Sequence, residues 1–150
     1  MPAESERERL RRVWNQRAIP VILRRPQGPL RMRLPYRASN RAWLRGPGRI
    51  NPAWKLMGRY WELPRAWFDR LVDQCLFDFG RVYVVQPYRE QEKCAPACWN
   101  AKGHECQCSC MGLNHGIHDD DGRWKIVSEA FATRWGPQEV ACRLIQARSE

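Results

Sequence analysis

Five of the seven cysteines in this 150-residue chain fall within seventeen residues, between Cys94 and Cys110. Thiolates at this density, with an imidazole beside them, are the ligand types of a structural zinc site. The spacing allows a quartet led by Cys94 and Cys98, a quartet built on Cys108, Cys110 and His115, or two ions that share a thiolate. The predicted Zn²⁺ ligands are Cys94, Cys98, Cys106, Cys108, Cys110 and His115.

Other chemistries of this cysteine-rich segment fit its sequence less well. Disulfides are disfavoured because the cysteine count is odd and no secretion signal opens the chain. The spacing matches no standard ferredoxin run. His104 and Glu105 are adjacent, whereas zinc deaminases separate these residue types by one position. An HNH-type nuclease is suggested by His115, His118 and Asp119, but no histidine pair opens that motif. We therefore expect a structural metal and no catalytic residues, so a non-enzymatic protein is favoured.

The charge of the chain is concentrated at its N-terminal end. The formal net charge is +10, from 26 Lys and Arg against 16 Asp and Glu. Residues 1–60 contain 15 basic and three acidic residues, whereas residues 61–150 contain 11 basic and 13 acidic ones. Of the basic residues 22 are Arg, whose planar guanidinium suits bidentate phosphate contacts. This asymmetry predicts a polyanionic partner, nucleic acid above all.

Hydrophobic alternation indicates where some of these cations lie. Leu30, Met32 and Leu34 alternate with Arg31 and Arg33, which predicts a strand with one buried face and one guanidinium-bearing face. Aromatic residues interleaved with arginine are typical of surfaces that bind single strands, although in a small domain they also serve as core. The predicted nucleic-acid contacts are Arg24, Arg25, Arg31, Arg33, Arg41, Arg45, Arg49, Lys55, Arg59 and Trp54.

The helices and strands that must position these residues are predicted from hydrophobic periodicity and from the residues that cap or end each element. Ser5 and Glu8 form a capping-box pattern before a helix over about residues 6–16. Residues 64–79 show helical spacing and end at Gly80. The other expected elements are strands over 21–25, 30–34 and 82–85, a helix from Ser39 or Asn40 to Leu44, a strand or hairpin over 54–63, and a hairpin over 124–135 and 139–145.

Residues 20–85 resemble the HARP domain of annealing helicases. The resemblance is carried by "RMRLPY" over residues 31–36 and "INPAWKLMGRYWELPRAWFDRLV" over residues 50–72. It implies a small α+β module that binds forked or single-to-double-strand DNA junctions through Arg31, Arg33, Lys55, Arg59 and the aromatic residues between them. No phosphate-binding G-x-x-x-x-G-K-[ST] motif occurs in the chain, so ATP-driven annealing is not implied.

The run over residues 94–116 is similar to a C-x-C-S-C-x-G-x-N-H-G signature of small uncharacterised phage and mobile-element proteins. That similarity implies a context and no specific activity.

Together these patterns predict an α+β fold, with a small, mostly antiparallel sheet, two or three helices and an inserted Cys-rich zinc loop. The expected parts are a basic N-terminal arm (1–18), an α+β core (19–92), a metal-binding insertion (93–122) and a C-terminal hairpin that completes the core (123–150).

We expect a cytoplasmic, zinc-stabilised nucleic-acid-binding protein, associated with a phage or mobile element, with no membrane partner and no small-molecule substrate. Two alternatives stay open. One is an inhibitor of a host nucleic-acid-binding defence complex, of the anti-CRISPR or anti-restriction type. The other is a metal-dependent nuclease.

Overall fold

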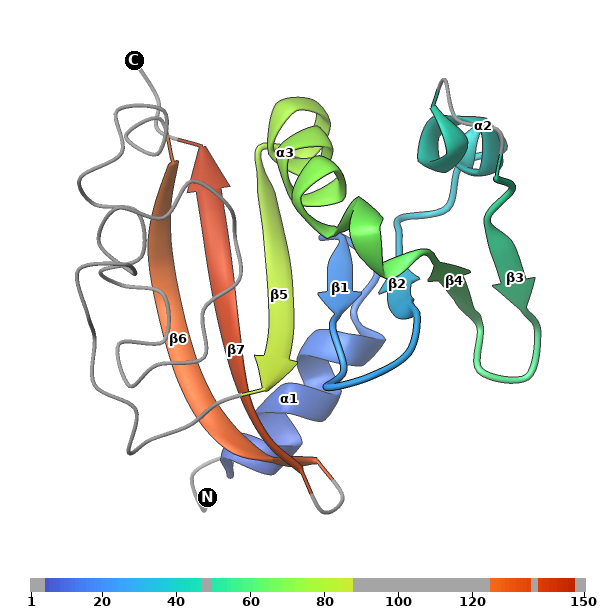
Figure 1. Cartoon of the computed structure of the whole chain (residues 1–150). Coiled ribbons are helices and arrows are strands. Elements are labelled where there is room, and N and C mark those ends of the chain that lie inside the picture. The colour runs from blue at the N-terminus through green and yellow to red at the C-terminus, as the bar shows by residue number, and fades with distance from the viewer. Residues whose placement is uncertain (1–4, 47–49, 88–124, 136–137, 148–150) are drawn as a thin grey trace.

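The computed structural model describes residues 5–46, 50–87, 125–135 and 138–147. Along this part of the chain, helices separate consecutive groups of two or three strands (Figure 1). The helices are α1 (Glu6–Asn15), α2 (Asn40–Arg45), the 3-10 turn η1 (Arg65–Trp67) and α3 (Phe68–Phe79). The strands are β1 (Val21–Leu23), β2 (Leu30–Arg33), β3 (Ala53–Lys55), β4 (Tyr60–Leu63), β5 (Arg81–Pro87), β6 (Lys125–Trp135) and β7 (Gln138–Ala147).

All seven strands belong to one sheet of order β3-β4-β2-β1-β5-β7-β6. Five of the six neighbouring pairs are antiparallel, and β1 and β5 are parallel. The predicted α+β class is confirmed, but the sheet is larger than expected. Its size follows from pairings distant in sequence, because β5 joins β1 to the β6–β7 hairpin.

Local sequence signals account for the ends of the helices. The Ser5 side chain accepts a hydrogen bond from the backbone N–H of Glu8 at 3.2 Å, which satisfies one of the unpaired donors at the start of α1. The C-terminal end of α3 is set by Gly80, whose φ of 79° places it in the left-handed region that glycine adopts without steric cost.

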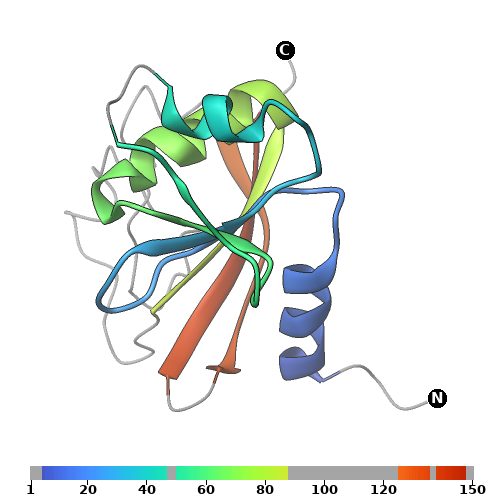
Figure 2. The same ribbon diagram turned by 90° about the vertical axis from the view of Figure 1, so that its right-hand side faces the viewer.

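The helices cover both faces of the sheet (Figure 2). On one face, α2 and α3 pack over Ile22, Met32 and Val84 in the larger apolar cluster. On the other face, Leu10 and Val13 of α1 pack with Val21, Tyr83, Phe131 and their neighbours. The sheet is therefore the middle layer of three.

The alternation predicted for β2 is confirmed. Leu30 and Met32 are fully buried beneath α3, whereas Arg31 and Arg33 are half-buried on the face that α1 covers. Arg31 lies over the ring of Tyr60 at 4.9 Å, and Arg33 lies over Trp14 at 4.4 Å. The guanidinium-bearing face of β2 is thus partly packed against aromatic rings.

Cys75 and Cys142 are buried in the core. All six predicted zinc ligands, from Cys94 to His115, lie outside the described residues. Within the described ranges, no group of three or more His, Cys, Asp or Glu side chains is arranged to hold a metal ion.

No helix in the described part of the chain combines the length and the apolar character needed to cross a membrane.

Candidate nucleic-acid interface

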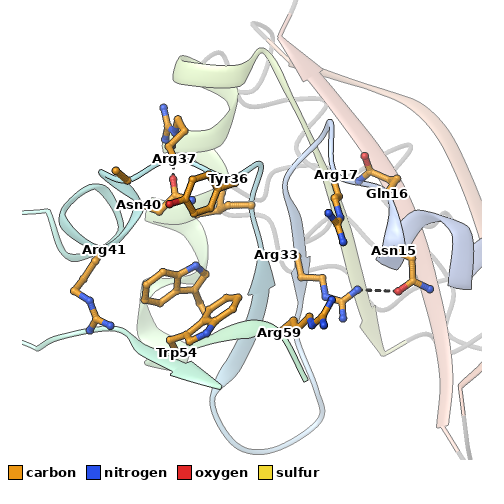
Figure 3. Close-up of a pocket in the computed structure, with 13 residues that line it drawn as sticks. Asn15, Gln16, Arg17, Arg33, Tyr36, Arg37, Asn40, Arg41, Trp54 and Arg59 are labelled. Carbon is orange, nitrogen blue, oxygen red and sulfur yellow. Dashed lines mark hydrogen bonds between the residues drawn. The ribbon is translucent and has the colours of Figure 1, made fainter. Parts of the chain in front are cut away.

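A cavity of about 750 Å³ opens where β2 ends, between the residues that follow α1 and the start of α2 (Figure 3). The β3–β4 hairpin supplies its remaining wall. The described residues that line it are Asn15, Gln16, Arg17, Arg33, Leu34, Tyr36, Arg37, Ala38, Asn40, Arg41, Trp54, Arg59 and Trp61.

Arg33 connects two walls of this cavity. Its Nη1 donates to the carbonyl oxygen of Trp14 and to Oδ1 of Asn15, both at 2.9 Å. Its Nη2 donates to the carbonyl oxygen of Gly58 at 2.8 Å. Arg33 therefore ties the C-terminal end of α1 to the β3–β4 turn, where the carbonyl end of the helix also favours a cation.

The β3–β4 turn presents Arg59 to the cavity in an uncommon backbone conformation. Arg59 has a φ of 54°, the only positive φ among the described non-glycine residues. This conformation costs free energy for a residue with a Cβ, and such costs cluster at functional sites. Glycine is required at the preceding position, because a Cβ on Gly58 would lie 2.1 Å from the Tyr60 ring.

The wall on the α2 side is fixed by a buried asparagine. Asn40 donates from Nδ2 to the carbonyl oxygen of Pro35 at 3.0 Å and accepts from Nε of Arg37 at 3.2 Å. The next residue, Arg41, donates from its guanidinium to the carbonyl oxygen of Pro52 at 3.1 Å. These hydrogen bonds fix the β2–α2 connection and position the residue that precedes β3 against α2.

Aromatic rings form the floor of the cavity. Trp54 and Trp61 are cross-strand partners on β3 and β4, with ring centroids 5.2 Å apart and planes inclined at 60°. The Arg41 guanidinium lies 5.2 Å from the Trp61 ring. Trp61 packs against the core, whereas Trp54 is 43% exposed and Tyr36 is 92% exposed. The site therefore offers aromatic surface to a ligand.

The electrostatics of the cavity are strongly positive. Five guanidinium groups line it, and the thirteen described lining residues include no Asp or Glu. Burial lowers the pKa of Arg33 from its usual value, and the positive charges of Arg17 and Arg59 lower it further. Like charges thus lie close enough to repel one another, which an anionic ligand would relieve.

Comparison of the chain with protein-family models, curated proteins and solved structures finds no match. The function of the site is therefore interpreted from its own geometry.

The cavity brings together four of the predicted nucleic-acid contacts, which are Arg33, Arg41, Trp54 and Arg59. Lys55 on β3 and Arg45 at the end of α2 are exposed but do not line the cavity. The four basic residues that the HARP resemblance implies as contacts, Arg31, Arg33, Lys55 and Arg59, do not lie on adjacent strands, because β4 lies between β2 and β3.

The remaining predicted contacts lie elsewhere. Arg25 is at the opposite end of β2, in the β1–β2 turn, where it donates to the carbonyl oxygen of Pro29 at 3.4 Å. Arg24 is only 6% exposed and its guanidinium lies over the Phe68 ring at 5.6 Å, so it has little surface to offer a phosphate. Arg49 lies outside the described residues.

Sequence reasoning missed Arg17, Tyr36 and Arg37, which lie on connections between elements. Arg17 follows α1 by two residues, and Tyr36 and Arg37 follow β2. A basic or aromatic residue just beyond the end of a predicted element is a usable signal, because loops carry much of the binding surface of proteins. The sequence alone does not show that these two connections meet.

Proposed function

We propose that this protein binds single-stranded nucleic acid, with DNA favoured over RNA, and that the cavity at the end of β2 is the contact site. The observation that carries the proposal is the combination of five guanidinium groups, two accessible aromatic rings and no lining carboxylate in the described cavity.

The positive charge supports a polyanionic ligand. The cavity lies within the first 61 residues, and residues 1–60 carry 15 of the 26 basic residues and only three acidic ones. Guanidinium groups bind phosphate oxygens through paired N–H donors and stay charged at any physiological pH. Arg17 and Arg59 are exposed, and neither side chain forms an ion pair with the described residues.

The aromatic floor supports a single strand over a duplex. Bases of a single strand can turn outwards and stack on aromatic rings, whereas bases within a duplex present only their edges. Trp54 offers an accessible ring backed by Trp61, and Arg41 lies over the other tryptophan of this pair. Stacking of this kind tolerates any base, so we expect little sequence specificity.

The other parts of the proposal rest on sequence. Stabilisation by zinc follows from the cysteine spacing over residues 94–115. Association with a phage or mobile element follows from the resemblance of residues 94–116, and binding at strand junctions follows from the resemblance of residues 20–85 to the HARP domain.

The test is fluorescence anisotropy with labelled single-stranded, duplex and forked DNA and single-stranded RNA, each titrated with salt. We expect the single-stranded and forked forms to bind more tightly than the duplex. Each lost phosphate contact lowers the log–log salt slope by roughly 0.7 on a single strand, so Arg17→Ala and Arg59→Gly should each show that change.

The matched control is Arg134→Ala, which removes the same charge from the opposite end of the sheet. Arg134 lies on the edge strand β6, and its side chain is 71% exposed, 3.6 Å from Glu139. Equal weakening by all three variants would locate binding outside the cavity. Absence of binding to every nucleic acid would overturn the proposal and favour the alternative in which the basic surface inhibits a defence complex.

A further inference from the structure

Three guanidinium groups meet on the α1 side of the cavity. Arg17 follows α1, Arg33 ends β2, and Arg59 belongs to the β3–β4 turn, so three separate segments bring them together. Figure 3 shows Arg33 and Arg59 beside Asn15, with the Arg17 side chain directed towards them. Their mutual repulsion contributes to the lowered pKa of Arg33.

This arginine trio has no compensating negative charge among the described residues. The hydrogen bonds of Arg33 go to two carbonyl oxygens and one amide oxygen, all uncharged. The turn also holds Arg59 at a φ of 54° despite the steric cost of that conformation. A fold that keeps three like charges together, one of them on a strained backbone, is suited to a small ligand of high negative charge.

Resting on the proposed function, we infer that the arginine trio binds the terminal phosphate of a nucleic-acid strand and that Trp54 stacks on the terminal base. A phosphomonoester carries about −1.5 to −2 charges at neutral pH and offers three acceptor oxygens. An internal phosphodiester carries a single negative charge. The cavity of about 750 Å³ is also in the size range that holds one small ligand group.

The inference predicts a pH dependence that comes from the ligand. The charged and titratable residues that line the cavity are Arg17, Arg33, Arg37, Arg41, Arg59 and Tyr36. Arginine and tyrosine do not change charge between about pH 5 and pH 8, whereas a phosphomonoester loses its second proton near pH 6. The preference for a phosphorylated end should therefore weaken as the pH falls below about 6.

The test compares single strands of about eight nucleotides that differ only at one end, a length within the range of known single-strand sites. One pair carries a 5′-phosphate or a 5′-hydroxyl, and a second pair carries a 3′-phosphate or a 3′-hydroxyl, with the label on the opposite end. A free nucleoside monophosphate serves as competitor. The purified full chain is measured by anisotropy at about pH 7.5 and pH 5.

At the higher pH we expect one phosphorylated end to bind about tenfold more tightly than its hydroxyl counterpart, since charge-assisted contacts to the extra charge are gained. The ratio should fall towards unity at the lower pH. Arg17→Ala and Arg59→Gly should each reduce it, and Arg134→Ala should leave it unchanged. Glycine accepts the backbone conformation of residue 59, so Arg59→Gly removes the guanidinium without adding strain.

Equal binding of phosphorylated and hydroxyl ends, with weakening by both cavity variants, would overturn this inference and leave the proposed function standing. A preference that persists in both variants would also overturn it. If the free nucleoside monophosphate competes with an affinity equal to that of the phosphorylated strand, the site binds a free nucleotide, and strand-end binding is overturned. Failure of every strand to bind would overturn the inference and the proposed function together.

Discussion

Replacing Arg33 should destabilise the fold measurably, because this side chain braces the cavity. Arg33→Met removes hydrogen bonds of 2.9 Å to the Trp14 carbonyl and 2.8 Å to the Gly58 carbonyl, together with the bond to Asn15 and the stacking over Trp14. A hydrogen bond to a charged donor contributes about 1.5–3 kcal/mol, and a partly exposed cation–π contact about 0.5–1 kcal/mol.

The net cost should be smaller than the sum of these contributions. Arg33 is half-buried, so water replaces part of what is lost, and its removal also relieves repulsion from Arg17 and Arg59. We therefore expect Arg33→Met to lower the free energy of unfolding by about 2–3 kcal/mol. In a chain of this length that corresponds to a fall in Tm of roughly 4–12 °C. Arg33→Lys should lose about half as much, since one ammonium group cannot reach all three oxygens.

The assay is urea unfolding followed by tryptophan fluorescence, with Arg31→Met as the matched control. Arg31 lies on the same strand and face, and its side chain contacts the Tyr60 ring but forms no hydrogen bond with any described residue. Its replacement should cost about 1 kcal/mol or less. If the two variants lose equal free energy of unfolding, or if Arg33→Met loses less than about 0.5 kcal/mol, Arg33 does not brace the cavity.

Four other expectations test the fold and the sequence-based metal prediction. Ser5→Ala should lower the free energy of unfolding by about 0.5–1 kcal/mol, because the N-cap bond to Glu8 is lost; a matched Ser39→Ala, whose side chain makes no cap bond, should change it little. Burial raises the pKa of the Cys75 thiol, and the nearby charge of Asp78 raises it further. The folded chain should therefore keep Cys75 protonated and unmodified by iodoacetamide at about pH 9, where an ordinary cysteine ionises. Rapid modification of Cys75, detected by peptide mass spectrometry, would contradict its buried position. Because the unfolded chain releases that proton and the folded chain keeps it, the contribution of Cys75 to the free energy of unfolding should decrease as the pH rises above about 8.5. Elemental analysis should find about one to two zinc ions per chain, and chelation should reduce ordered structure cooperatively. Metal-free protein with its cysteines oxidised would contradict the zinc prediction.

The elements of this fold could be predicted from the sequence because their signals are local. The capping serine before α1, the strict alternation of β2 and the glycine after α3 each act within a few residues. The order of the strands could not be predicted in this way. The parallel pairing of β1 with β5 joins Val21 to Tyr83, and no periodicity within either strand specifies that partner.

The candidate site was predictable to the same limited extent. Arg33, Arg41, Trp54 and Arg59 were selected from charge and aromatic content, which are properties of composition. The same criteria also selected Arg24, which the fold buries beside Phe68. Convergence of Arg17 with Arg59 depends on how α1 and the β3–β4 turn meet across β2, and that is a tertiary property.

Photo-crosslinking followed by peptide mass spectrometry tests the location of nucleic-acid binding most directly. A single strand that carries a photoreactive thymidine at or next to its phosphorylated end would be irradiated with the full chain, and the crosslinked peptides sequenced. We expect attachment at Trp54, Tyr36 or Trp61, with a reduced yield of this product in Arg17→Ala but not in Arg134→Ala. Crosslinks confined to residues outside the cavity would contradict it.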